Sequence, residues 1–136
     1  MQVWEDELWR LTTSLYAETH GFSYLEPKRH IPNLADLDGD EAVTFGPVLA
    51  RVTSALKDAS DAQLVYVYVF GGSVPHLHLH LAPHSEGDAL NDTMLRGNIT
   101  ERKLDSGLVE LVSDEFPPLP REDLEQTAER IRTLLS

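Results

Sequence analysis

The 136-residue sequence contains no cysteine, which excludes disulfides and thiolate zinc sites and fits a reducing compartment. It also lacks an apolar run near the length of about 18 residues that a membrane-spanning helix needs. Its opening residues, MQVWEDE, do not have the basic and apolar regions of a signal peptide. We therefore expect a cytoplasmic protein that does not associate with a membrane.

Basic residues are scarce as well. The chain has 11 Lys and Arg against 23 Asp and Glu, which gives a formal net charge of −12 and a pI near 4.7. Proteins that wrap nucleic acid polymers neutralise many phosphates with Lys and Arg, so we do not expect such a polymer as a partner. A small phosphate ligand is compatible with this charge, because a few N–H groups and imidazoles can bind one phosphate locally.

The length predicts a single domain over residues 1–136 that is large enough to bury a core. Apolar residues at intervals of three and four predict an amphipathic helix from Asp38 to Ala59 and a terminal helix over residues 121–135. Asp38 and Glu41 have the spacing of a capping box, and Pro47 predicts a kink or a late start of the first helix.

Shorter apolar and β-branched segments predict strands. We expect them within residues 3–13, 22–27, 63–70 and 108–112, and the segment over 63–70 should form an antiparallel hairpin with the next strand. Residues 85–91 are expected to form a loop, and residues 92–103 a loop or a short helix.

The most informative stretch is residues 65–84, which reads VYVYVFGGSVPHLHLHLAPH. Three histidines alternate there with three leucines: His76, Leu77, His78, Leu79, His80 and Leu81. Successive side chains of a strand point to opposite faces, so we expect the leucines to face a core and the imidazoles to face a cleft. Imidazoles with an ordinary pKa of about 6.5 can act as nucleophile, base or ligand near neutral pH.

The residues alone leave three interpretations of the histidines. They could be packed or solvated structural residues, which is the usual role of a single strand histidine. They could hold a metal ion, because two histidines one residue apart on a strand can both reach one zinc ion, although no cysteine or carboxylate in register supports this. They could also form a catalytic cluster.

The segment HLHLHLA at residues 76–82 resembles the His-φ-His-φ-His-φ-φ signature of the histidine triad (HIT) family of nucleotide hydrolases and transferases. As in that family, a glycine and hydroxyl segment over residues 71–74 precedes it, and EPKRHI at 26–31 resembles the family's Pro-Lys-x-His segment. The resemblance covers about Trp4 to His84 and leaves residues 85–136 as a C-terminal extension.

The resemblance implies an α+β, HIT-like fold and a homodimer. The fold would be an antiparallel sheet of about five strands, with the helix over residues 38–59 on one face, the histidine cleft on the other, and a C-terminal helix. Lys28, Arg29 and His30 would mark this fold more than they would bind phosphate.

The resemblance also implies a reaction on a nucleotide or dinucleotide. His78 would attack the α-phosphorus and form a nucleotidyl-histidine intermediate that water or another acceptor resolves. His76 and His80 would orient His78 and contact the phosphate or the leaving group, and Ser73 with Gly72 would bind phosphate. The activity would be that of a nucleoside phosphoramidase or a dinucleoside polyphosphate hydrolase, with no obligatory cofactor and room for a divalent ion that arrives with the substrate.

The sequence departs from the family pattern near the site. Phe22 stands where the family usually has a fourth histidine, and Gly72 stands where it commonly has a glutamine. His20 is either a substitute for that fourth histidine or a solvated loop residue, and the extra His84 is either a loop residue or part of a metal or phosphate site. These departures keep two alternatives open: a nucleotide-binding protein with little catalysis, and a metal-binding histidine cluster.

Overall fold

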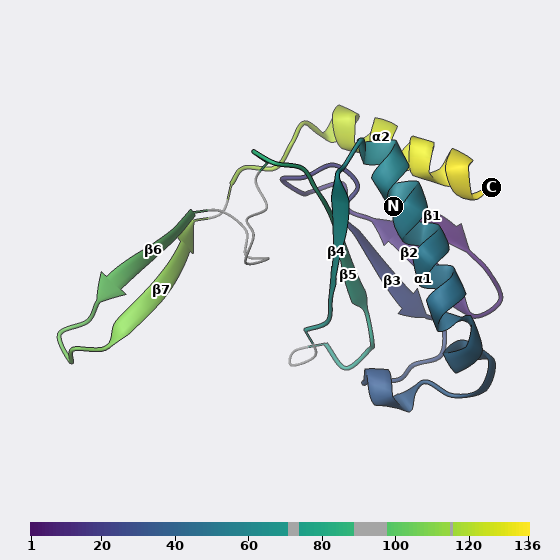
Figure 1. The fold of residues 1–136 in the computed structure, drawn as a ribbon, viewed down its shortest axis with the longest axis horizontal. Helices are drawn as coiled ribbons and strands as arrows, with labels where there is room; N and C mark the ends of the chain where they lie inside the picture. The colour runs from purple at the N-terminus through teal and green to yellow at the C-terminus, as the bar shows by residue number, and fades with distance from the viewer. Residues whose placement is uncertain (71–73, 89–97, 115) are drawn as a thin grey trace.

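The computed structural model describes residues 1–70, 74–88, 98–114 and 116–136, with side chains described except at 98–100 and 111–114 (Figure 1). The elements in chain order are β1 (Gln2–Glu5), β2 (Trp9–Thr13), β3 (Ser23–Pro27), the 3₁₀ turn η1 (Leu34–Asp36), α1 (Gly39–Ser60), β4 (Leu64–Tyr68), β5 (Leu79–His84), β6 (Asn98–Lys103), β7 (Val109–Asp114) and α2 (Arg121–Leu135). Gly72 and Ser73 lie outside the described residues.

Five strands form one antiparallel sheet in the order β1-β2-β3-β5-β4, and two helices accompany it. The α+β fold expected from the sequence is therefore confirmed. The predicted hairpin of β4 and β5 is also confirmed, with Tyr68 opposite His80 and Leu64 opposite His84. β5 reaches the centre of the sheet because its other edge pairs with β3, where Tyr24 is opposite His80.

The main core lies between the sheet and α1. Leu77, Leu79 and Leu81 are at most 2% exposed and belong to the same buried cluster as Val52 and Leu56 of α1. The expectation that the leucines of the histidine segment face a core is confirmed. Burying a leucine side chain contributes about 1.5–3 kcal/mol, so this alternation holds the segment in one register.

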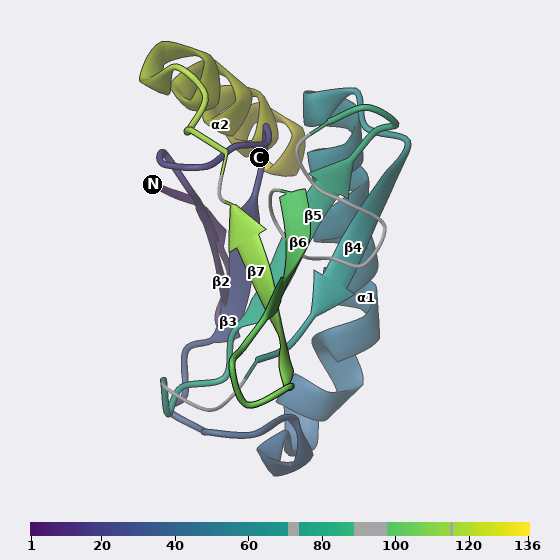
Figure 2. The same ribbon diagram turned by 90° about the vertical axis from the view of Figure 1, so that its left-hand side faces the viewer.

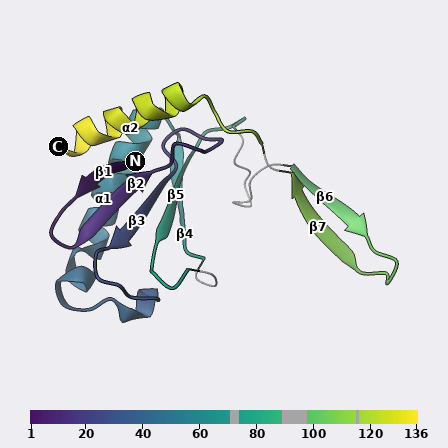
Figure 3. The same cartoon turned by 180° about the vertical axis from the view of Figure 1, so that it is seen from behind.

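The terminal helix α2 covers the end of the core beside the N-terminus. In Figure 3 it crosses near the start of β1 and the C-terminal half of α1. Its buried residues recur on one stripe, as predicted: Leu124, Thr127, Ala128, Ile131 and Leu135. None of the helices among the described residues is long and apolar enough to cross a bilayer.

The start of α1 differs from the sequence prediction in two details, the late start and the capping box. The helix begins at Gly39 and continues through Pro47, so there is no late start. Its buried stripe on the sheet offsets the backbone hydrogen bond that proline removes. The capping box is not formed either: Asp38 accepts a hydrogen bond from the N–H of Gly39, and the Glu41 carboxylate binds Arg29 instead of turning back to the helix start.

The segment after β5 also differs from the prediction. Residues 98–103 form β6, which pairs with β7, rather than a loop or short helix. Residues 92–97 of that predicted segment lie outside the described residues. The turn between the strands is closed by the N–H of Gly107 on the carbonyl of Leu104, with Gly107 at a positive φ of 85° that suits glycine. Figures 1 and 2 show this hairpin extending from the side of the sheet opposite α1.

Candidate active site

The histidines lie on the face of the sheet opposite α1, among aromatic rings. His80 is central: its ring is stacked on Tyr68 at 4.9 Å and meets the edge of Tyr24 at 5.2 Å. Both tyrosines are the register partners of His80 on the neighbouring strands, so the sheet itself places the three rings side by side. The His78 ring follows at 4.9 Å from His80.

The His78 ring is held by a backbone carbonyl. Its Nδ1 lies 2.8 Å from the carbonyl oxygen of His76. A carbonyl can only accept, so Nδ1 of His78 carries the proton and donates it, which leaves the lone pair of the neutral ring on Nε2. His78 is half-buried. It therefore presents a nitrogen with the electronic state of a nucleophile or base on the face away from the core.

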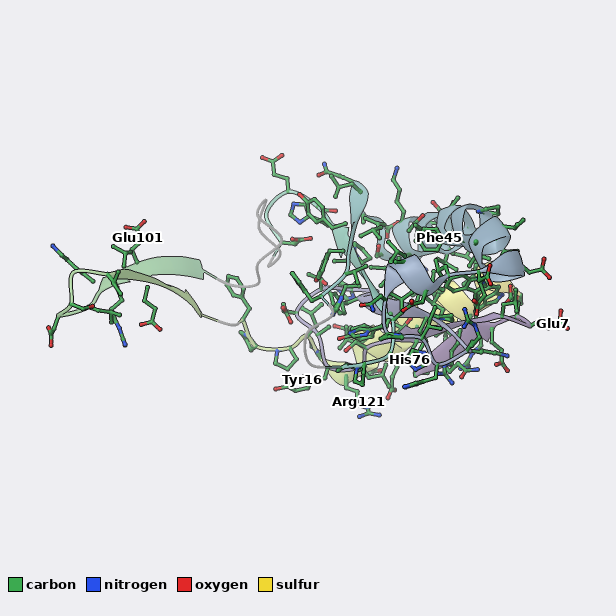
Figure 4. The ribbon with its side chains drawn as sticks, turned by 90° about the horizontal axis from the view of Figure 1, so that it is seen from below. Glu7, Tyr16, Phe45, His76, Glu101 and Arg121 are labelled. Atoms are coloured by element: carbon green, nitrogen blue, oxygen red, sulfur yellow. The ribbon has the colours of Figure 1, made fainter. Side chains whose placement is uncertain are left out.

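His76 is bound at both ring nitrogens. Its Nε2 lies 2.9 Å from the carbonyl oxygen of Pro27 and 3.7 Å from a carboxylate oxygen of Glu26. Its Nδ1 lies 3.1 Å from Nδ1 of His30. Of the two roles expected for His76, orientation of His78 and contact with the substrate, this geometry favours orientation. Figure 4 places His76 on the main body of the molecule, far from Glu101 of the hairpin.

Phe22 stands at the position where the resemblance implies a fourth histidine. It is 2% exposed and packs against Tyr24 at 5.3 Å and His80 at 6.2 Å. Phe70, on the other side, lies 5.8 Å from His80. Aromatic rings on both sides therefore orient His80.

His20 and His84 lie together elsewhere, at the far end of β5. Both line a cavity of about 450 Å³. His20 is an exposed residue whose Nδ1 lies 3.3 Å from the hydroxyl of Thr127, so it does not take the place of the fourth histidine. The expectation that His84 lies in a loop is wrong: it is the last residue of β5, 8% exposed, and its Nδ1 lies 2.6 Å from Asp88. Sequence reasoning missed Asp88, although its i,i+4 spacing from His84 was a usable signal.

Lys28 and Arg29 are engaged by carboxylates rather than directed to the histidines. Lys28 binds Glu5 at 2.7 Å and Arg29 binds Glu41 at 2.6 Å. The hydrogen bond from Arg29 holds the pKa of Glu41 below its ordinary value, while burial of Glu41 opposes this shift. The two cations therefore tie the end of β3 to its neighbours, which agrees with a role in the fold.

The predicted phosphate-binding residues Gly72 and Ser73 lie outside the described residues. Among the residues that the structure describes, no group of three or more His, Cys, Asp or Glu is arranged to hold a metal ion. The engaged nitrogens of His76 and His78 agree with this, because they point to carbonyls and to His30 rather than to one common centre.

Comparisons with known proteins agree with the observed fold. Residues 2–87 match the HIT domain. The adenylylsulfatase HINT3 of Arabidopsis thaliana is 24% identical over 133 residues, which covers 93% of this chain and 68% of that protein.

Two solved structures illustrate the shared fold. The chain is 23% identical to a HIT-like protein involved in cell-cycle regulation from Bartonella henselae, with a TM-score of 0.66 over 98% of this chain and 85% of the other. It is also 23% identical to a hypothetical histidine triad nucleotide-binding protein from Sulfolobus tokodaii, with a TM-score of 0.69 over 98% and 82%. Since the HIT match spans more than half of the sequence, this chain belongs to the HIT domain family.

Proposed function

We propose that this protein is a nucleotide hydrolase or nucleotidyl transferase in which Nε2 of His78 attacks the α-phosphorus of the substrate. The observation that carries the proposal is the 2.8 Å hydrogen bond from Nδ1 of His78 to the carbonyl of His76. It keeps the lone pair on Nε2 before attack and stabilises the positive charge that develops on the ring afterwards.

The reaction has two steps. In the first, the Nε2–phosphorus bond forms and the bond from phosphorus to the leaving nitrogen or oxygen breaks. The leaving group departs with the electron pair, and a leaving nitrogen takes up a proton from solvent so that it departs as a neutral amine. In the second, the oxygen of water or another acceptor attacks phosphorus and releases its proton to solvent, the nitrogen–phosphorus bond breaks, and His78 is regenerated. The covalent intermediate divides one difficult displacement into two easier ones. We assign contact with the phosphoryl oxygens to His80, and its ring 4.9 Å from that of His78 supports this role.

The proposed substrates are nucleotides that carry a leaving group on the α-phosphate. Nucleoside phosphoramidates and dinucleoside polyphosphates are the first candidates. Adenylyl sulfate joins them because the similar Arabidopsis protein is an adenylylsulfatase. No resident cofactor enters these steps, a divalent ion can accompany a polyphosphate, and a homodimer is the expected assembly.

Phosphorus NMR of the purified protein with these three substrate classes, with and without magnesium and chelator, tests the proposal. We expect release of nucleoside monophosphate, and a nucleotidyl adduct on His78 in rapidly quenched samples. His78→Ala should abolish both while the protein stays folded, because the side chain is half-buried outside the leucine core. His20→Ala is the matched control, an exposed imidazole away from the site. Unchanged turnover by His78→Ala contradicts the proposal.

A second candidate function is nucleotide binding with little catalysis. The observation in its favour is Phe22, which packs at 6.2 Å from His80 where a polar imidazole would stand in relatives. Calorimetry that shows micromolar binding of adenosine or guanosine phosphates, with no product over a day, would support this function instead. The alternative of a metal-binding histidine cluster has no comparable observation behind it.

A further inference from the structure

The segment that carries the first two histidines is not held by the sheet. The pairing of β3 with β5 ends at Leu25 opposite Leu79, and β5 itself begins at Leu79. His76 and His78 therefore precede the ladder that positions His80. Other contacts must hold them, because an unpaired extended segment has many accessible conformations.

Those contacts come from the chain that leaves the end of β3. The carbonyl of Pro27 accepts from the His76 ring at 2.9 Å, and the carbonyl of Ile31 accepts from the N–H of Leu77 at 2.7 Å. Between these two carbonyls, the ring of His30 meets the ring of His76 at 4.9 Å with an interplanar angle of 89°. The chain after β3 thus replaces the missing ladder with one backbone bond and two contacts to the His76 ring.

The carbonyl of Pro27 determines which ring nitrogens of His76 and His30 carry protons. Because the Pro27 oxygen can only accept, Nε2 of His76 carries a proton, and in the neutral ring Nδ1 of His76 is then an acceptor. The 3.1 Å contact between the two Nδ1 atoms therefore requires that Nδ1 of His30 donates. A His76 ring without this donor could turn over or change tautomer, and its Nε2–H bond to Pro27 would be lost.

We propose that His30 is a positioning residue for His78, which rests on the proposed function: by donating Nδ1–H to His76 it fixes the ring and backbone of His76, whose carbonyl orients the attacking imidazole. The effect passes through His76, since its carbonyl accepts the Nδ1–H of His78 at 2.8 Å. His30 itself does not contact the substrate in this arrangement.

The charged groups around the pair are already engaged with one another. Glu26 lies 3.7 Å from Nε2 of His76 and is bound by Arg10 at 2.7 Å. The neighbours of His30 in sequence, Lys28 and Arg29, bind other carboxylates. Of Lys28, Arg29 and His30, it is therefore His30 whose described hydrogen bond reaches one of the three clustered histidines, His76.

The proposal can be tested without unfolding the protein. His30 is exposed, and the core contact of this segment is made by the next residue, Ile31, which is 4% exposed. We therefore compare wild type with His30→Ala and with His30→Asn, whose amide nitrogen lies close to the position of the imidazole Nδ1. His20→Ala, another exposed histidine, is the control.

Two measurements are made on each protein. Nitrogen NMR of the imidazoles reports the tautomers of His76 and His78, and steady-state kinetics separate kcat from KM. We expect His30→Ala to lower kcat about tenfold, the effect of losing one hydrogen bond, with KM little changed. We also expect it to convert His76 from a single Nε2–H tautomer to a mixture. His30→Asn should restore most of both properties, and His20→Ala should resemble wild type.

The outcomes separate this inference from the proposed function. If His30→Ala retains the wild-type kcat and the His76 tautomer, the role of His30 is refuted while the role of His78 stands. Equal losses of kcat in the alanine and asparagine variants with an unchanged His76 tautomer also refute it, because they indicate a general structural effect. If the wild type turns over no substrate, the proposed function fails, and the NMR comparison still decides whether His30 sets the tautomer of His76.

Discussion

The two ends of β5 each carry bound imidazoles, but the partners differ in kind. At the N-terminal end, His76 and His78 are bound by the backbone carbonyls of Pro27 and His76. At the C-terminal end, His84 is bound by the carboxylate of Asp88 and is buried under the stacked ring of Tyr66. A carbonyl selects a tautomer without adding a charge, whereas a carboxylate places a negative charge beside the ring. The first arrangement suits a neutral nucleophile, and the second suits a structural tie.

The largest expected difference between the two ends is in catalysis. His78→Ala should lower kcat by at least about 10³-fold, because loss of a nucleophile removes the covalent route entirely. His84→Ala should change kcat by no more than a few-fold, since His84 lies at the other end of the strand. Phosphorus NMR assays of both variants measure this difference. Comparable losses in both would show that the two ends act in one site.

A second experiment tests whether Phe22 limits kcat at the N-terminal end of β5. Phe22→His places a fourth imidazole beside His80, as in relatives, and we expect kcat to rise about tenfold. The buried position makes the variant less stable by about 1–3 kcal/mol, since the new polar ring loses water. Kinetics at a temperature where circular dichroism shows both proteins folded measure the change, with Phe22→Leu as the apolar control. A lower kcat in Phe22→His would show that the aromatic packing is itself required.

The C-terminal end should matter for stability instead. Asp88→Asn replaces the charged acceptor of His84 with a neutral amide, and we expect the free energy of unfolding to fall by about 1 kcal/mol with kcat unchanged. Urea denaturation measures the loss. Asp105→Asn, an exposed acid in the turn between β6 and β7, is the matched control and should have no effect. An equal loss in the control would mean that overall charge, not the His84 contact, is responsible.

The smallest expected effect concerns the ion pair between Arg29, which follows β3, and Glu41 of α1. Arg29 lowers the pKa of Glu41. A carboxyl whose folded pKa is lowered adds stability above its ordinary pKa of about 4.3, and this contribution is lost as pH falls through the folded value. We expect a modest loss of stability below that pH in wild type. In Glu41→Gln, the part of this pH dependence that comes from Glu41 should be missing. Thermal unfolding between pH 3 and 7 measures both slopes, and identical slopes would contradict this assignment.

Much of the fold could be predicted because its signals are local. The alternation of leucine and histidine assigned Leu79 and His80 to opposite faces, and the spacing of apolar residues found α1 and α2. Predictions failed where a weak local signal competed with tertiary contacts. Glu41 looked like half of a capping box, but its carboxylate binds Arg29, which precedes it by 12 residues.

The candidate site also combines features that could be predicted from the sequence with features that could not. The shared face of His76, His78 and His80 could be predicted from the sequence, since strand geometry requires nothing beyond adjacent residues. The role of His78 as the nucleophile came only from the resemblance to the HIT family. The contact of His30 with His76 could not, because 46 residues separate them and only the end of β3 brings them together.

The order of residues alone therefore determined which face of β5 is apolar, which imidazoles share the other face, and which family the segment resembles. The tertiary structure decided which ring nitrogens hold protons, since each proton depends on an acceptor contributed by another part of the backbone. It also decided that β5 begins at Leu79, so the chain after β3, rather than the sheet, holds His76 and His78. Side-chain direction is a local property of the backbone, whereas the electronic state of an imidazole depends on its partners in space.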